Sequence, residues 1–193
     1  MTLKKVIVAI TGATGVIYGI KLLEALRACP EAEVHLIVSE MAEKIIVLET
    51  PLTIAAVEDL ADCRYGFRDM TAAVASGSYP VYGMAVVPCS MRTLAAIAHG
   101  FADNLITRAA DVSLKEKRKL ILAPRETPLN LIHLQNMLAA AQAGACLMPP
   151  TPAFYNHPSD IDDLLNHLTG RIMDQLDLPF APAKRWRGCV DKK

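Results

Sequence analysis

The residues whose types and spacing best suit chemistry begin with a turn rich in glycine and threonine, Thr11-Gly12-Ala13-Thr14-Gly15. The turn follows the apolar run 6–10 and precedes apolar residues at helical spacing over 17–26. A turn between a buried strand and a helix directs free backbone N–H groups and the positive end of the helix dipole at a ligand, which suits a phosphate. The same pattern is also typical of a tight turn that binds nothing.

Four other loops follow predicted strands and carry further polar groups. They span 39–40, 88–93, 124–128 and 149–157, and they supply hydroxyls, Arg92, Arg125, Glu126 and Tyr155, with Glu49 nearby. Ligands of parallel α/β sheets bind at the carboxyl ends of the strands. These loops, together with the first turn, are therefore the predicted site.

Several kinds of catalytic site find no support in the motifs. No histidine pair has H-E-x-x-H or H-x-H spacing, which argues against a metal site. Cys89 has no identifiable base, and G-x-S-x-G does not occur, so nucleophilic hydrolysis is not indicated. Asp160, Asp162 and Asp163 follow Ser159, the predicted helix cap, and the helix dipole explains them better than a magnesium–diphosphate site does.

Arg108 and Lys115 lie seven residues apart on a predicted helix and therefore share a face. Asp111 lies between them at spacings of three and four, so the three side chains could form an intrahelical charge stripe. Alternatively, the two cations could form a wall that binds a phosphate. Spacing alone leaves both readings open.

The apolar periodicity predicts five strands that alternate with helices. Strands are expected at 6–10, 33–38, 84–87, 119–123 and 145–148, and helices at 17–26, 41–48, 53–61, 91–99, 104–117, 131–143 and 160–176. Residues 62–83 are expected to be irregular. This alternation predicts an α/β fold with a doubly wound parallel sheet, in a single domain spanning 1–193.

The composition and charge of the chain exclude some classes of binding partner. Of 193 residues, 52% are hydrophobic and 21% charged, and 20 basic residues balance 20 acidic ones. This balance argues against nucleic acid or an anionic membrane as a partner, and the apolar excess would suit an oligomer. No apolar run approaches the ~20 residues of a membrane span. The five cysteines lie far apart, as expected of reduced thiols in a cytoplasmic protein.

Nine motifs together resemble the UbiX-like flavin prenyltransferases. They are TGATG at 11–15, Ser39, ETP at 49–51, ASGS at 75–78, PCSMRTL at 88–94, RAADVSLKE at 108–116, PRETPL at 124–129, HLQNML at 133–138 and PPTPAFYNHP at 149–158. The likeness runs from Val6 to Trp186. It implies a Rossmann-like, flavodoxin-type fold and a homododecamer with the active site at a subunit junction.

The resemblance also implies the reaction. A dimethylallyl group would pass from dimethylallyl monophosphate to N5 and C6 of reduced FMN, without a metal. The product, prenylated FMN, would serve a separate aromatic-acid decarboxylase. The residue types suit this chemistry, because cations and hydroxyls can hold a leaving phosphate while the flavin supplies the nucleophile.

Residue roles follow from the resemblance. FMN would be bound by Gly12, Ala13, Thr14, Ser39, Ser90, Met91, Arg92, Thr93 and Arg125. The prenyl phosphate would be bound by Ser76, Arg108, Lys115, Tyr155 and Arg171. Glu49 and Glu126 would handle protons and charge, and Trp186 would wall the prenyl pocket in a C-terminal tail that extends over the site from about residue 180. Thr14 stands where the family often has serine. It keeps the hydroxyl, but the added methyl group restricts the side-chain rotamer on which a proton relay would depend.

Three alternatives compete with this reading. A non-catalytic FMN-binding subunit of a decarboxylase system would keep the FMN loops and could dispense with the phosphate cations. Short-chain dehydrogenases share a similar turn, but no tyrosine here has a lysine four residues later, and Ser39 stands where a ribose-binding Asp is expected. The related cysteine-decarboxylating flavoproteins have a catalytic histidine and an Asn-containing substrate motif that find no convincing counterpart here.

Overall fold

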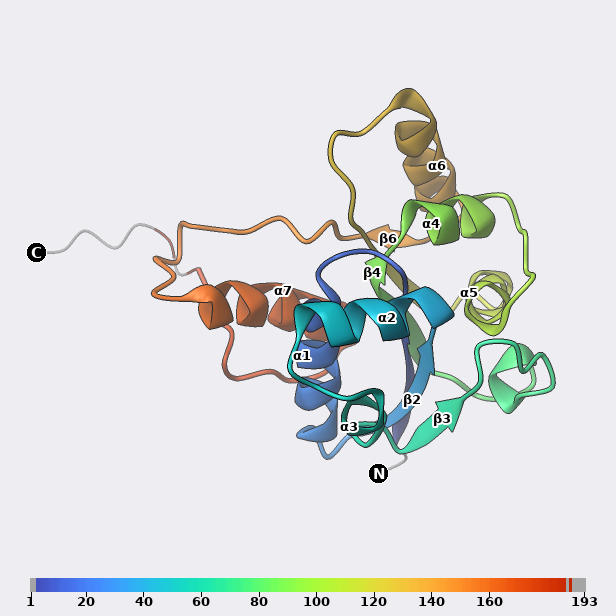
Figure 1. The fold of residues 1–193 in the computed structure, drawn as a ribbon, viewed down its shortest axis with the longest axis horizontal. Coiled ribbons are helices and arrows are strands. Elements are labelled where there is room, and N and C mark those ends of the chain that lie inside the picture. The colour runs from blue at the N-terminus through green and yellow to red at the C-terminus, as the bar shows by residue number, and fades with distance from the viewer. Residues whose placement is uncertain (1–2, 187, 189–193) are drawn as a thin grey trace, which may run out of the picture.

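The first strand, β1 (Lys4–Ile10), lies inside a six-stranded parallel sheet in the computed structural model of this chain, which describes residues 3–186 and 188. The strand order is β3-β2-β1-β4-β5-β6 (Figure 1). The other strands are β2 (Ala32–Val38), β3 (Cys63–Tyr65), β4 (Gly83–Cys89), β5 (Lys119–Pro124) and β6 (Cys146–Leu147). The predicted parallel, doubly wound α/β fold is confirmed.

Seven α-helices and one short 3₁₀ helix connect or follow the strands in the described part of the chain. They are α1 (Val16–Arg27), α2 (Glu40–Glu49), α3 (Ile54–Glu58), η1 (Ala73–Ala75), α4 (Met91–Ala98), α5 (Leu105–Lys115), α6 (Leu131–Gln142) and α7 (Ile161–Gln175). None of these helices combines the length and apolar character that crossing a membrane requires.

Side chains of β1 alternate between two hydrophobic cores, one on each face of the sheet. Val6, Val8 and Ile10 pack with residues of α1 and α7, whereas Ile7 and Ala9 pack with residues of α4 and α5. Burial on both faces explains why the strand reads as one continuous apolar run.

Two expectations need correction. Residues 62–83 are not wholly irregular, because Cys63–Tyr65 pairs with β2 as the edge strand β3. Without β3, the order of the other five strands is that of flavodoxin, and β3 extends it to the Rossmann order. The cap of the last helix is Asp160, whose side chain accepts a hydrogen bond from the Asp163 N–H, and not Ser159.

Helix α6 packs mainly against α4 and projects from the body of the domain (Figure 1). Only Asn136 and Ala140 of this helix are buried. Leucine and isoleucine side chains on its outer surface are instead exposed, at Leu131, Ile132, Leu134 and Leu138. Exposed apolar side chains that gather in this way are typical of surfaces that bind another protein.

Candidate functional site

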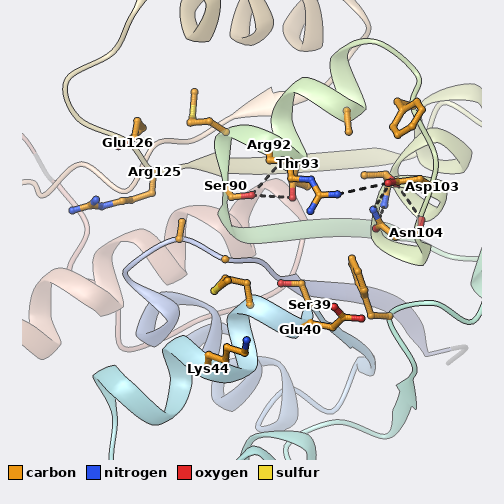
Figure 2. Close-up of a pocket in the computed structure, with 18 of the residues that line it drawn as sticks. Ser39, Glu40, Lys44, Ser90, Arg92, Thr93, Asp103, Asn104, Arg125 and Glu126 are labelled. Carbon is orange, nitrogen blue, oxygen red and sulfur yellow. Dashed lines mark hydrogen bonds and ion pairs between the residues drawn. The ribbon is translucent and has the colours of Figure 1, made fainter.

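A cavity of about 760 Å³, called the main cavity below, opens at the carboxyl ends of β1, β2, β4 and β5 (Figure 2). The cavity is lined by every residue predicted to contact FMN, together with Glu126; these are Gly12, Ala13, Thr14, Ser39, Ser90, Met91, Arg92, Thr93, Arg125 and Glu126. Parallel strands explain this convergence, because all their carboxyl ends lie at one edge of the sheet. The volume is within the range of small-molecule and cofactor sites.

Thr11 joins the first turn to the loop after β4. The residue is 1% exposed, and its Oγ1 donates to the Pro88 carbonyl at 2.8 Å. The same Oγ1 accepts from the Ser90 N–H at 2.7 Å. These two bonds fix the spacing between the two loops that line the cavity.

Three helices begin at the cavity, and each has a side-chain cap. The Ser39 hydroxyl accepts from the Ala42 N–H in α2, and the Ser90 hydroxyl accepts from the Thr93 N–H in α4. Asn104 caps α5 through the Thr107 N–H. The N-termini of α2, α4 and α5 direct positive dipole ends to one place, which favours an anionic ligand.

The N-terminus of α1 was expected to bind a phosphate, but a group of the chain itself occupies it. A side-chain carboxylate, Glu49, accepts from the N–H groups of Gly15 at 2.9 Å and Val16 at 3.2 Å. Glu49 does not line the main cavity, although it was predicted to lie near the flavin. These two donors of α1 are therefore satisfied within the chain.

Charged groups on the cavity wall form ion pairs. Arg92, whose side chain is 87% exposed, lies 3.8 Å from Asp103 (Figure 2). Glu40 is paired with Arg68 at 2.7 Å, and this hydrogen bond holds the pKa of Glu40 below its usual value.

Sequence reasoning missed several residues of the cavity. They are Met41, Lys44, Phe67, Ala96, Phe101, Asp103, Asn104 and Thr107. Glu40 also lines the cavity, and it lies in the predicted loop 39–40, although no role was assigned to it. Met41 follows Glu40 directly and could have been found by extending the loop 39–40 by one residue. Phe67 and Phe101 lie outside the strand-end loops, and no motif marked them.

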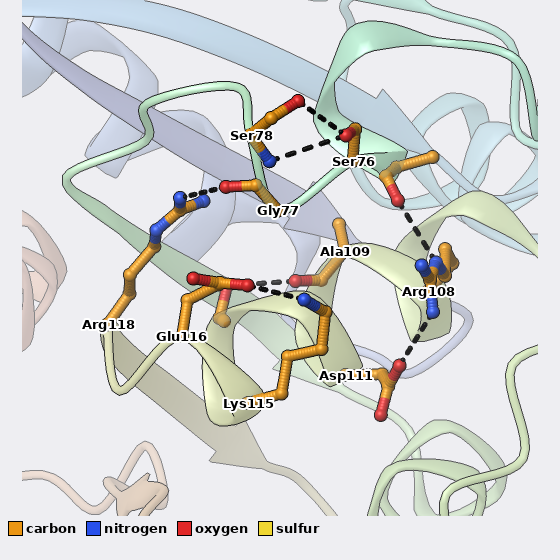
Figure 3. Close-up of polar contacts among 11 residues, drawn as sticks. Ser76, Gly77, Ser78, Arg108, Ala109, Asp111, Lys115, Glu116 and Arg118 are labelled. Carbon is orange, nitrogen blue, oxygen red and sulfur yellow. Dashed lines mark hydrogen bonds and ion pairs between the residues drawn. The ribbon is translucent and has the colours of Figure 1, made fainter.

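The residues predicted to bind the prenyl phosphate fall into two groups. The first group, Ser76, Arg108 and Lys115, lies where the turn after η1 meets α5 (Figure 3). Arg108 donates to Asp111 at 2.8 Å and to the Ala75 carbonyl at 3.0 Å. Lys115 pairs with Glu116, not with Asp111. Of the charge stripe that the spacing left open, only the Arg108–Asp111 pair forms.

The second group, Tyr155, Arg171 and Trp186, lines a separate cavity of about 190 Å³. The rings of Tyr155 and Trp186 meet edge to face, with centroids 5.6 Å apart. The Tyr155 hydroxyl lies 3.0 Å from His167 Nε2, a neighbour that the motifs did not reveal. Burial and the nearby Arg171 guanidinium lower the pKa of His167. Neither group lines the main cavity.

Comparison with known proteins identifies the family to which a chain with these sites belongs. A family model described as Flavoprotein matches residues 1–173. A probable UbiX-like flavin prenyltransferase from Streptomyces sp. (strain D7) is 52% identical over 184 residues, which cover 95% of this chain and 92% of the relative. The chain belongs to the UbiX-like flavin prenyltransferase family. The resemblance predicted from the motifs is confirmed, and so is the enzyme class.

Two other members of the UbiX-like family are similar to this chain over nearly its whole length. The flavin prenyltransferase LpdB of Lactiplantibacillus plantarum (strain ATCC BAA-793 / NCIMB 8826 / WCFS1) is 51% identical over 186 residues, which cover 96% of this chain and all of LpdB. The crystal structure of a dodecameric FMN-dependent Ubix-like decarboxylase from Escherichia coli O157:H7 superposes with a TM-score of 0.94 at 51% identity, over 95% of this chain and 100% of that one.

A second similar structure was solved with ligands bound. AnUbiX (PadA1), in complex with FMN and dimethylallyl pyrophosphate, superposes with a TM-score of 0.95 at 49% identity, over 97% of this chain and 100% of that one. The cysteine decarboxylase TvaF, at 17% identity and a TM-score of 0.63 over 76% of this chain and 90% of that one, shares the fold alone.

Proposed function

We propose that this chain transfers a dimethylallyl group from dimethylallyl monophosphate to N5 and C6 of reduced FMN. The prenylated FMN would pass to a partner aromatic-acid decarboxylase in the cytoplasm. The observation that carries the proposal is the convergence of all nine predicted FMN contacts on one cavity, in a chain that also retains all five predicted phosphate contacts. The retained phosphate contacts favour transfer over a non-catalytic FMN-binding subunit.

The main cavity fits FMN by size and by electrostatics. Three capped helix N-termini and Lys44 offer donors and positive potential for a phosphate. Thr11 holds two of the lining loops at a fixed spacing. Reduced FMN, when bound, supplies the electron-rich N5 that attacks the allyl group; the protein's task is positioning.

The prenyl phosphate would be held between subunits. Within one chain, the Ser76 group and the Tyr155 group are separate, and together they contain the three cations needed to bind a leaving phosphate. The exposed leucines and isoleucine of α6 offer an apolar surface for self-association. A dodecamer, the assembly of the E. coli relative, would bring one group from each of two chains together.

Four further residues are proposed to take part in the reaction itself. Glu126 lines the main cavity and would move protons or balance charge beside the flavin. Glu49 would act through the first turn, which it contacts at Gly15, and the exposed Thr14 hydroxyl would serve as a relay. Trp186, against Tyr155, would stabilise a developing allyl cation with its ring, in a tail that would cover the site.

The test is incubation of the enzyme with reduced FMN and dimethylallyl monophosphate in excess EDTA, read by the mass of the released flavin. We expect a gain of one prenyl unit, and faster transfer from the monophosphate than from the diphosphate. Activity that EDTA abolishes and magnesium restores would contradict metal independence. Tight FMN binding with no product would instead support the non-catalytic subunit.

A further inference from the structure

Polar side chains gather on one face of the sheet at its β2–β3 edge, away from the residues that line the main cavity. Glu33 and His35 alternate along β2 and therefore point to the same face. Cys63 of β3 is the register partner of His35, which places its side chain beside the imidazole. The donor atoms of these three residues lie within 4.8 Å of one another.

We propose that Glu33, His35 and Cys63 form a zinc site, with water as the fourth ligand. Thiolate, imidazole and carboxylate are the ligands that zinc takes in proteins. Bonds of about 2.0–2.3 Å in a tetrahedron hold ligand atoms about 3.3–3.8 Å apart. Atoms that lie within 4.8 Å of one another therefore need to close by at most about 1.5 Å. His35 is 0% exposed, while Glu33 retains 24% side-chain exposure, so solvent reaches the carboxylate side.

The outer contacts of His35 suit a metal ligand. Its Nδ1 lies 2.8 Å from Tyr65 Oη, and its Nε2 lies 3.2 Å from Glu33 Oε1. A proton on Nδ1, donated to Tyr65, leaves the Nε2 lone pair directed toward Glu33. Metal-binding histidines characteristically donate the N–H of their other ring nitrogen to an oxygen acceptor, which fixes the ring orientation. The Tyr65 hydroxyl would be that acceptor here.

One cation, the Lys5 ammonium group, would repel a zinc ion bound at this site. Lys5 Nζ lies 3.9 Å from Glu33 Oε1 and donates to Tyr79 Oη at 2.9 Å. A bound ion would replace Lys5 as the partner of Glu33, while Lys5 would keep its contact with the Tyr79 hydroxyl and ring. Removing the ammonium charge should therefore tighten zinc binding, a result opposite in sign to the loss of a ligand.

The site has a structural consequence for the rest of the domain. The edge strand β3 has only three residues, and the chain passes from it through Gly66 to Phe67, which lines the main cavity. Zinc would join β3 to β2 and so stabilise the segment that carries Phe67. The proposal is independent of prenyl transfer, since its ligands take no part in that chemistry.

The test is titration of tag-free protein, stripped with EDTA and desalted, with Zn²⁺ alone against a competing chelator, and with Co²⁺ followed by absorbance. We expect one ion per chain, a thiolate-to-cobalt charge-transfer band, and a rise in Tm with zinc. Cys63→Ser should abolish the band and weaken zinc binding by roughly 100-fold or more, beyond the 10–100-fold typical of an outer contact. Tyr65→Phe should weaken it about 10-fold, and Lys5→Met should strengthen it.

Cys146→Ser, at another partly buried thiol, is the matched control and should leave the affinity unchanged. Far-UV circular dichroism checks folding, and Glu33→Gln, at a partly exposed position, supplies a second ligand variant. No saturable binding, or equal affinity in wild type and Cys63→Ser, would overturn the proposal. An unchanged affinity in Lys5→Met would place the ion away from Glu33 and overturn it as well.

Discussion

Glu49 Oε2 lies 2.9 Å from the backbone nitrogen of Gly15 and accepts its hydrogen bond, although 34 residues separate the two. The carboxylate thereby ties the C-terminal end of α2 to the turn that begins α1. A negative charge at this position also interacts favourably with the dipole of α1.

Replacing Glu49 by Gln should therefore reduce stability. The amide oxygen can still accept from Gly15, but the charge–dipole interaction is lost, so we expect the free energy of unfolding to fall by about 0.5–1 kcal/mol. Urea denaturation measures this change. Glu58→Gln, which removes only a surface ion pair with Arg64 at 3.6 Å, is the control and should change stability less.

Glu126→Gln should slow prenyl transfer on the order of 10²-fold, because the variant keeps the shape of the side chain and loses its proton-accepting group. FMN affinity should change little. Single-turnover assays and flavin titration measure the two quantities, with Glu43→Gln, an exposed carboxylate outside both cavities, as control. Normal turnover in Glu126→Gln would assign that residue a structural role only.

Two inactive variants should complement each other if the phosphate site is shared between chains. Arg108→Met and Arg171→Met disable different groups, so random mixed oligomers retain one intact site in about four, and co-expression should restore roughly a quarter of wild-type activity. Size-exclusion chromatography verifies that both variants assemble. Co-expressed oligomers as inactive as either parent would mean that one chain supplies both groups.

Stability should also depend on His167 at mildly acidic pH. Burial and Arg171 lower the folded-state pKa of this imidazole, so the unfolded chain binds its proton more readily. The free energy of unfolding should thus decrease as pH falls through the ordinary histidine pKa of about 6.5. Thermal denaturation between pH 8 and 5 should show a smaller loss in His167→Gln than in wild type. Parallel curves for the two proteins would contradict this assignment.

Much of the fold followed from local pattern. Val6–Ile10 is buried on both faces, and a parallel strand with that burial carries an uninterrupted apolar run, which is visible in the sequence. The nine predicted FMN contacts share one cavity because they follow strands whose carboxyl ends lie at the same edge of the sheet. Motif resemblance supplied the family, because motifs such as PRETPL and PPTPAFYNHP belong to a likeness that runs from Val6 to Trp186.

The tertiary structure decided what depends on contacts between distant residues. Three-residue β3 has too few positions to show a period, and only its pairing with β2 brings Cys63 beside His35. The family resemblance grouped Arg108 with Arg171, yet the path of the chain places them in separate groups. The N–H groups at the start of α1 could serve any anion, and the folded chain gives them to Glu49. Sequence spacing specifies which neighbours share a face of a helix or strand, whereas strand register and loop paths determine which distant side chains meet.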